Sequence, residues 1–139
     1  MPPGRNMDDW MTILRSGQWR LNFSLSAEGK ARYFGEFLPL LNQTKLNVLK
    51  ERDDDSWYLV YVGTRPAAQR MGLAKKIIQH VTAIADREGR ATYLENSHST
   101  NLPFYQRMGF ERARKIYLQR DHEAIELDIM IREPVVDRT

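Results

Sequence analysis

The stretch WYLVYVGTRPAAQRMGLAKKII, residues 57–78, joins a short run of strand-forming residues to a long amphipathic run. Residues 57–62 are aromatic, β-branched or leucine, a composition typical of a strand that is buried on both faces. From about Arg70 to Glu88 the apolar residues recur at helical spacing, which predicts a helix that Gly89 ends. This strand-to-helix junction decides the fold.

The predicted helix has one apolar stripe, which should face the core, and an opposite charged face. The expected buried stripe consists of Leu73, Ile77, Val81, Ile84 and Ala85. A second strand is predicted at 91–95, so strand, helix and strand form a βαβ unit with parallel strands and a right-handed crossover.

The sequence after this unit predicts a short helix and a pair of strands. The helix runs from about Asn101 to Met108, and Gly109 ends it so that Phe110 can fold back on it. Strands are expected at 115–119 and 124–131, around a turn at 120–122. Apolar and polar residues alternate along the last strand, which predicts that one of its faces is buried. The fold class is therefore α/β with a mixed sheet.

Residues 1–56 are predicted to be a helical segment without strands. A short helix should begin at Asp8 or Asp9 and end at Gly17, and Ser26 should cap a long helix that runs towards Lys50. Pro39 is expected to kink or break that helix. The aspartates at 53–55 indicate a solvated loop rather than a metal site. The expected organisation is one compact domain, with a helical segment at 1–56 and a core at 57–139.

Composition excludes several classes of protein. The chain has 139 residues, about one domain, and contains no cysteine, so disulfides, thiolate metal sites and a catalytic cysteine are excluded. Its three histidines are scattered and predict no metal site. The net charge of +3 comes from interspersed residues, not from the dense basic stripe of a nucleic-acid binder. Because we find neither a signal peptide nor a membrane span, a cytoplasmic location is expected.

The segment QRMGLA, residues 69–74, lies at the junction and in the first turn of the predicted helix. Backbone N–H groups there lack intrahelical partners, and anions bind such places when side chains leave room. Gly72 and Ala74 leave that room, while Arg70 and Lys75 add positive charge, so the segment is interpreted as a pyrophosphate cradle. The alternative is a glycine that allows tight packing of helix on sheet. The spacing fits neither the dinucleotide fingerprint nor the P-loop.

Two segments, YLVYVGTRPAAQRMGLAKKII and YLENSHSTNLPFYQRMGF, together resemble the GNAT superfamily of N-acetyltransferases, most of all its fungal members. Gln69, Gly72 and Ala74 match the Q/R-x-x-G-x-G/A signature of that family. A second family segment, Tyr-x-x-x-Gly-Phe, is matched by Tyr105, Gly109 and Phe110. The resemblance covers residues 57 to about 131, and the preceding helical stretch is similar to an insertion in fungal relatives.

The resemblance implies that acetyl-coenzyme A binds between two parallel strands that splay apart. Its pantetheine arm would pair with the backbone around Val62, Gly63 and Thr64. Its pyrophosphate would lie on the turn formed by Gln69, Arg70, Met71, Gly72, Leu73, Ala74 and Lys75. His98 stands where relatives carry an asparagine that contacts the cofactor. Asn101 is a further cofactor candidate, although capping of the following helix is the favoured role.

The chemistry expected of such a protein is direct attack of a primary amine on the thioester. The amine belongs to a small molecule or a peptide, and no metal is required. The reaction needs a base, a donor for the carbonyl oxygen and an acid for the thiolate. Tyr105 is the predicted acid, with a core tyrosine as the alternative. Glu95 is the predicted base, with a salt-bridged carboxylate or a water chain as the alternatives. Trp57, Tyr61 and Tyr117 are candidate pocket aromatics or core residues.

The chain departs from the family pattern because the strands expected before residue 57 are not found in it. An open apolar edge at 57–62 would result, which predicts a homodimer or a strand-exchanged dimer. The alternative function is a noncatalytic acyl-coenzyme A-binding or interaction domain derived from a truncated GNAT protein. A nucleic-acid-binding module is the least favoured hypothesis.

Overall fold

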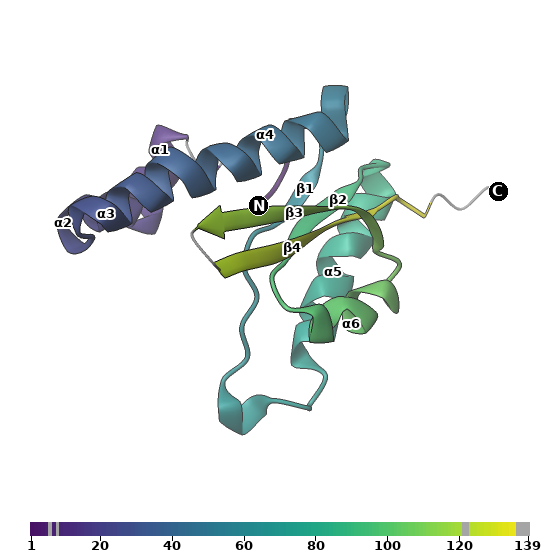
Figure 1. Ribbon diagram of the computed structural model, residues 1–139. Helices are drawn as coiled ribbons and strands as arrows, with labels where there is room; N and C mark the ends of the chain where they lie inside the picture. Colours follow the sequence, from purple (N-terminus) through teal and green to yellow (C-terminus); the bar gives the residue numbers. More distant parts are fainter. Residues whose placement is uncertain (6, 8, 121–122, 136–139) are drawn as a thin grey trace.

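The computed structural model describes residues 1–5, 7, 9–120 and 123–135. The described part combines a helical N-terminal portion with a four-stranded sheet (Figure 1). The helical portion contains α1 (Trp10–Ser16), α2 (Leu21–Ser24), α3 (Ala27–Lys30) and α4 (Leu38–Leu49). The remainder contains β1 (Trp57–Leu59), α5 (Leu73–Glu88), β2 (Thr92–Asn96), α6 (Leu102–Gln106), β3 (Glu111–Arg120) and β4 (Glu123–Arg132). Single 3₁₀ turns lie at Gln18–Arg20, Lys50–Arg52, Pro66–Ala68 and Ser99–Asn101.

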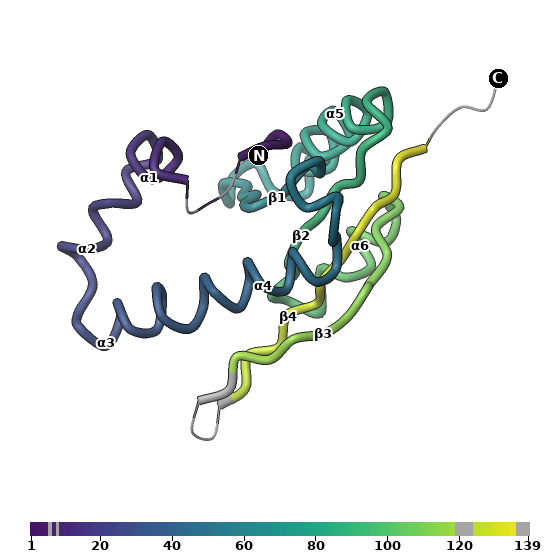
Figure 2. Tube along the Cα trace, turned by 90° about the horizontal axis from the view of Figure 1, so that it is seen from above, coloured from purple at the N-terminus to yellow at the C-terminus, as the bar shows by residue number. Residues whose placement is uncertain are grey.

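The N-terminal helices leave the sheet at α1 and return along α3 and α4 (Figure 2). Gly17 ends α1 with a left-handed φ of 77°, as predicted. Asp9 occupies the first cap position without a side-chain capping bond, and Asp8 lies outside the described residues. The Ser26 hydroxyl accepts a hydrogen bond of 3.1 Å from the Gly29 N–H, so the predicted cap of the long helix is confirmed.

Pro39 does not break the long helix, contrary to expectation. The seven residues Ala31–Phe37 form a π-helical stretch between α3 and α4. Pro39 then falls in the first turn of α4, where a missing N–H is tolerated. The change of hydrogen-bonding register before the proline keeps the chain helical as far as Leu49.

The sheet has the strand order β1-β2-β4-β3. Strands β1 and β2 are parallel, with α5 between them in sequence, so the predicted βαβ unit is present. The other two pairs, β2 with β4 and β3 with β4, are antiparallel. The mixed α/β fold expected from the sequence is therefore the observed one.

Strand β1 is shorter and more exposed than the run 57–62 predicted. It stops at Leu59, and the next two residues, Val60 and Tyr61, are 37% and 89% exposed. Among the described strands, β1 pairs with β2 alone and is therefore an edge strand. On its outer side the backbone of Met1 bonds to the N–H and C=O of Tyr58, at 3.0 and 2.5 Å. The prediction of a strand buried on both faces was wrong.

The helix predicted from about Arg70 begins at Leu73, and its buried stripe is displaced from the predicted one. The fully buried residues are Ile78, Thr82 and Ala85, whereas Leu73 and Ile77 are 37% and 60% exposed. The sheet beneath this end of the helix ends at the short edge strand β1. Met1 lies beyond β1, but the side of the helix that carries Ile77 remains exposed.

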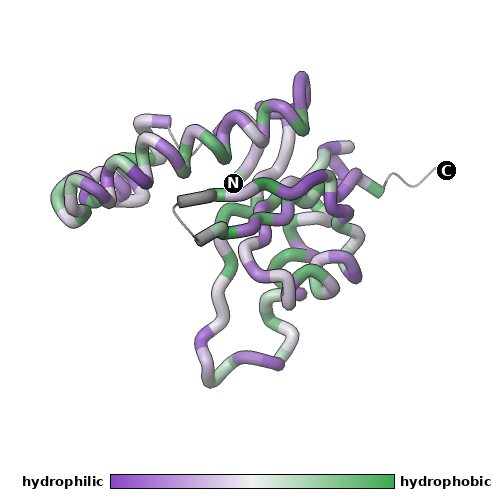
Figure 3. The backbone as a smooth tube through the Cα atoms, viewed as in Figure 1, coloured by the Kyte–Doolittle hydropathy of each residue, from purple (hydrophilic) through white to green (hydrophobic). Residues whose placement is uncertain are grey.

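The sheet is a middle layer, with α4 on one face and α5 and α6 on the other (Figure 1). The core on the α4 side includes Leu41, Leu49, Tyr58, Tyr93 and Ile129. The core on the α5 and α6 side includes Ile78, Leu94, Tyr105, Phe110 and Met130. Both apolar and polar residues occur along α4 (Figure 3), and its buried residues include the polar Thr44 and Lys45 as well as three leucines.

Strand β4 is buried on both faces, which the period of two along it did not predict. Asp128 and Met130 are buried as well as Leu127 and Ile129, because β4 lies between β2 and β3 under both helical layers. Ile125 is 56% exposed. The predicted strand pair is confirmed, while its turn residues 121–122 lie outside the described part.

The end of α6 follows the prediction. Gly109 has a left-handed φ of 87°, and the Phe110 N–H donates to the Tyr105 C=O at 3.2 Å. The two aromatic rings meet edge to face with centroids 6.0 Å apart. Phe110 is thereby folded back against α6 and is almost completely buried.

Candidate functional site

Strands β1 and β2 pair over only three residues and then separate. Trp57, Tyr58 and Leu59 lie opposite Thr92, Tyr93 and Leu94. Strand β2 continues for two residues, but these pair with β4 alone: Glu95 with Ile129 and Asn96 with Asp128. The chain after Leu59 is not in strand conformation, so it leaves β2 at the carboxyl ends of both strands. Ligands of open α/β sheets bind at such ends.

The segment between β1 and α5 extends beyond the body of the sheet and carries the predicted anion cradle (Figure 1). Gly72 precedes α5 with a left-handed φ of 75°, and a Cβ built there would have no atom within 4 Å. The packing explanation for this glycine is therefore wrong, since no helix or strand approaches it. The left-handed backbone at this position explains why a glycine stands here, and the space in front of it is open.

The start of α5 is available to an anion. No side chain of the described residues caps it, and its first turn contains no acidic residue. The first backbone N–H to pair within the helix is that of Lys76, which donates to the Gly72 C=O at 3.0 Å. Arg70 has a positive φ of 63° and is exposed, as is Lys75. Unpaired backbone donors and two positively charged residues thus occur together around the start of this helix.

The other predicted cofactor residues surround this segment. Val62 packs at the margin of the core on the α5 side, and Gly63 lies beside the ring of Tyr61. The Gln69 side-chain amide donates to the Thr64 C=O at 3.3 Å, which closes the loop on itself. Met71 is 63% exposed and Ala74 is half-buried. The loop therefore holds its own conformation without filling the space before α5.

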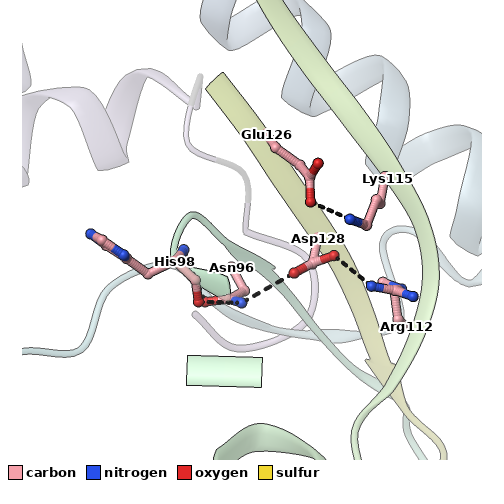
Figure 4. A network of polar contacts seen from close by, with 6 residues as sticks. All are labelled: Asn96, His98, Arg112, Lys115, Glu126 and Asp128. Atoms are coloured by element: carbon pink, nitrogen blue, oxygen red, sulfur yellow. Dashed lines mark hydrogen bonds and ion pairs between the residues drawn. The ribbon is translucent and has the colours of Figure 1, made fainter. Parts of the chain in front are cut away.

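A buried polar network fixes the loop that follows β2 (Figure 4). The Asn96 side-chain amide donates to the His98 C=O at 2.9 Å and to the Asp128 carboxylate at 3.4 Å, and it accepts from the His98 N–H at 3.3 Å. Arg112 donates to the other carboxylate oxygen of Asp128 at 3.3 Å. Lys115 and Glu126 form a further ion pair beside it. The network holds His98 by its backbone and leaves its imidazole exposed.

Asn101 does not cap α6 with its side chain, contrary to the role favoured from the sequence. It stands at the cap position with φ and ψ of −86° and −12°, a helical conformation, and it makes no side-chain capping bond. An N-cap residue that bonds through its side chain has an extended backbone. The Asn101 side chain is exposed and remains a candidate for cofactor contact.

Tyr105 lies in α6 and contacts the core on the α5 side of the sheet. It is 9% exposed, between the rings of Phe104 at 5.2 Å and Phe110 at 6.0 Å. Burial raises the pKa of its phenol, so the hydroxyl remains protonated at neutral pH. Leu59 and Val62, on either side of the point where the chain leaves β2, pack against the same core.

Glu95 lies near the end of β2 on the opposite face, towards α4. Its Oε2 accepts a hydrogen bond of 2.7 Å from the Tyr58 hydroxyl. Burial raises the pKa of its carboxyl group, while the Tyr58 hydrogen bond acts in the other direction. The predicted base and the predicted acid thus lie on opposite faces of the sheet, because Leu94, the neighbour of Glu95 in β2, packs in the same core as Tyr105 and adjacent strand residues point to opposite sides.

The three candidate pocket aromatics do not come together. Tyr61 is 89% exposed on the loop, and Tyr117 is 55% exposed on β3. The Trp57 indole donates to Glu88 at 2.8 Å, at the far end of β1. None of them is a fully buried core residue, so the core interpretation is wrong for them.

Sequence reasoning missed the groups that surround Glu95, above all Tyr58 and Lys45. The pattern at 57–62 predicts a buried strand and gives no sign that the Tyr58 hydroxyl has a polar partner. Lys45 is 5% exposed, and its ammonium pairs with the Asp53 carboxylate at 2.7 Å. An ionisable residue at an apolar helical position, between Leu41 and Leu49, was the signal that could have revealed it.

Two of the aspartates in the loop at 53–55 form ion pairs. Asp53 binds Lys45, and Asp55 lies 3.1 Å from Arg90. Over the described ranges, no group of three or more histidine or acidic side chains is arranged to hold a metal ion. None of the described helices is long and apolar enough to cross a bilayer.

Comparison with known proteins gives a family and a curated relative. Residues 43–112 match the model of the acetyltransferase (GNAT) domain. An uncharacterized N-acetyltransferase of Schizosaccharomyces pombe is 55% identical over 134 residues, which are 96% of this chain and 54% of that protein. The chain therefore spans about half the length of the curated relative that it matches.

Solved structures of acetyltransferases are similar to parts of the chain. A structure described as histone acetyltransferase HPA2 and related acetyltransferase, from Corynebacterium glutamicum, is 26% identical with a TM-score of 0.49, over 60% of this chain and 44% of that one. The ribosomal-protein-S18-alanine N-acetyltransferase of Escherichia coli is 20% identical with a TM-score of 0.47, over 59% of this chain and 58% of that one.

The match to the family model covers half of the chain. It extends from within α4, through the separated strands and the cradle, as far as the start of β3. Both motifs on which the resemblance was based, Gln69 to Ala74 and Tyr105 to Phe110, fall inside it. The chain belongs to the GNAT acetyltransferase family.

Proposed function

We propose that this domain transfers an acetyl group from acetyl-coenzyme A to a primary amine of a small molecule or a peptide. Family membership supports an acetyltransferase, and the separation of β1 and β2 beside the uncapped start of α5 is the observation that carries the proposal. The separated strands leave backbone groups unpaired for a chain-like ligand, and the start of α5 offers donors to its phosphates.

The residues of this chain fit the diphosphate of such a cosubstrate. A Cβ at Gly72 would enter open space, and Arg70 and Lys75 lie within three residues of Gly72 along the chain. Val62, Gly63 and Thr64 would hold the pantetheine arm, and Gln69, Met71, Leu73 and Ala74 would complete the turn around the diphosphate. His98 and Asn101, on the loop after β2, are proposed to contact the same ligand. When bound, acetyl-coenzyme A supplies an activated thioester, so no nucleophile of the protein is needed.

Tyr105 and Glu95 are proposed to move the protons. Tyr105 keeps its hydroxyl protonated at neutral pH because burial raises its pKa, which suits an acid that donates to a departing thiolate. Glu95 carries a carboxyl group next to the point where the strands separate, which suits a base for the incoming amine. No metal is assigned a role in this reaction.

Two measurements test the proposal. Acetyl-coenzyme A should raise the melting temperature of the protein, while ATP and NAD at equal concentration should not, because only a ligand of the native state stabilises it. Release of free thiol should then depend on an added primary amine from a panel of polyamines and peptides. A thermal shift without amine-dependent thiol release would indicate the noncatalytic acyl-coenzyme A-binding alternative instead.

A further inference from the structure

A cluster of polar groups is buried on the sheet face that α4 covers. It contains the Glu95 carboxyl group, the Tyr58 hydroxyl from β1 and the Tyr93 hydroxyl from β2. Tyr58 is 6% exposed and Tyr93 is completely buried. Within the described chain, the Tyr58 hydroxyl donates to Glu95 Oε2 at 2.7 Å, and the buried Tyr93 hydroxyl also interacts with the Glu95 carboxyl group.

The Tyr58 ring is held in place from three directions. The Lys45 ammonium lies 5.7 Å from the ring centroid, and the Tyr93 ring meets it edge to face at 5.4 Å. Its backbone is bonded to Met1 on one side of the strand. Lys45 is itself fixed, because its ammonium donates to the Asp53 carboxylate and to the Asp53 C=O at 2.7 and 2.8 Å. The hydroxyl therefore has a defined position.

The bond from Tyr58 to Glu95 joins two parallel strands at the place where they separate. Tyr58 lies opposite Tyr93, and Glu95 is the first residue of β2 beyond the last pair with β1. The side chain of Tyr58 thus reaches past the end of the pairing to the carboxyl group. A hydrogen bond donated at that point fixes Oε2 and so sets the orientation of the whole carboxylate.

We propose that Tyr58 is the positioning residue of Glu95: its hydroxyl holds Oε2 and thereby orients the carboxylate that receives a proton from the acceptor amine. This inference rests on the proposed function of Glu95 as the base. In the transfer, an N–H bond of the ammonium breaks and its electron pair stays on nitrogen, while an O–H bond forms on the Glu95 carboxylate.

The charges around Glu95 support this role. Burial raises the pKa of its carboxyl group, whereas hydrogen bonds from Tyr58 and, to a smaller extent, Tyr93 lower it, as does the positive charge of Lys45. From its own strand Tyr93 faces it, and from β4 the paired residue is the apolar Ile129. A hydrogen bond donated to the ionised carboxylate favours that form, so Tyr58 helps to keep a buried base ionised.

A titration of Glu95 itself tests the contact without any assay of activity. Protein with carbon-13-labelled glutamate side chains is titrated by NMR, and Glu95→Gln identifies the Glu95 signal. Tyr58→Phe should move the Glu95 titration to higher pH than in the unchanged protein. Tyr93→Phe removes an equally buried hydroxyl from the facing residue, and it should move the titration less. An unchanged titration in Tyr58→Phe, or equal shifts in both variants, would overturn the proposal.

Kinetics test the catalytic meaning of the contact. Tyr58→Phe should lower kcat about tenfold and move the acid limb of the pH profile upwards, with the KM for acetyl-coenzyme A unchanged. A merely structural role would change the melting temperature without moving the profile, and that result would overturn the proposal. If the unchanged protein shows no amine-dependent turnover, the proposed function fails. A shifted Glu95 titration would in that case still establish the contact but remove its catalytic role.

Discussion

Arg132, the last residue of β4, donates two hydrogen bonds to the carboxylate of Asp86 in α5, at 2.6 and 2.8 Å. The same guanidinium donates to the Met108 C=O at 3.0 Å, and the Asp86 carboxylate accepts from the Val135 N–H at 2.8 Å. The two side chains are only 10% and 20% exposed. The central strand, α5 and the end of α6 are thus joined through one buried ion pair.

Arg132→Lys should destabilise the fold by about 3 kcal/mol. Lysine cannot form a bidentate pair with the Asp86 carboxylate, which would then lose a hydrogen bond while remaining largely buried. Urea unfolding measures the effect. Arg52→Lys is the matched control, since Arg52 also makes two bonds to one carboxylate, that of Glu133, but both side chains are about half exposed. Its cost should stay below about 1 kcal/mol. Equal losses in both variants would contradict the distinction.

The Asp86 pair should also make stability depend on acid pH. The Arg132 hydrogen bonds hold the pKa of the Asp86 carboxyl group below its usual value of 3.8. A depressed pKa in the folded state contributes stability above the unfolded value, and that contribution is lost as pH falls through the folded-state pKa. Urea unfolding from pH 7 down to pH 3 should therefore show a steeper acid loss for the unchanged protein than for Asp86→Asn. Parallel curves would refute this.

Gly72→Ala should weaken binding of acetyl-coenzyme A. The left-handed φ of Gly72 costs an alanine about 1 kcal/mol, and its Cβ would enter the space proposed for the diphosphate. Gly89→Ala is the control, because Gly89 ends the same helix with a φ of 67° and an equally open surrounding. Both variants should lose similar stability in thermal melts. Only Gly72→Ala should lower the affinity measured by calorimetry, and equal affinities would argue against the cradle.

Tyr105→Phe should lower turnover about 100-fold while binding of acetyl-coenzyme A is retained, because only the proton donor is removed. Thiol release and thermal shift measure the two properties separately. Tyr117→Phe serves as the control, since Tyr117 is 55% exposed on β3 and has no proposed role. Full turnover in Tyr105→Phe would remove this residue from the mechanism.

The open side of β1 predicts self-association. An apolar groove of about 110 Å³ lies there, lined by Met1, Trp57, Leu59, Ile77 and Val81 among others. Light scattering is expected to give the mass of a dimer. Ile77→Glu should shift the mass to that of a monomer, because the glutamate would place an unpaired charge in the interface. Gln79→Glu, on the exposed polar face of α5, should leave the mass unchanged. A monomer at all concentrations would contradict dimerisation.

The elements and the order of the βαβ unit could be predicted because local patterns determine them. Ser26, Gly17 and Gly109 act within a few residues, so capping and left-handed positions are visible in the sequence. The exposure of Ile77 could not be predicted, because it depends on what lies beyond β1. Likewise the burial of Asp128 follows from the central place of β4, which periodicity along one strand does not reveal.

The candidate site was predictable where it consists of backbone and less so where it consists of side-chain contacts. The sequence indicated the open, left-handed position of Gly72 through the lack of a side chain, and the place of Tyr105 in α6 through its spacing from Gly109. The bond between Tyr58 and Glu95 joins residues 37 positions apart through a register that only the folded sheet establishes. The ammonium of Lys45 above the Tyr58 ring comes from a helix whose packing partner the sequence did not specify.

The brief pairing of β1 with β2 has a thermodynamic consequence. The chain after Leu59 makes no ladder bonds with β2, so a bound ligand must restrict the freedom of this segment as it engages the backbone. Association should accordingly release heat and carry an unfavourable entropy, and amide hydrogens in 60–72 should exchange with solvent more slowly once the ligand is present.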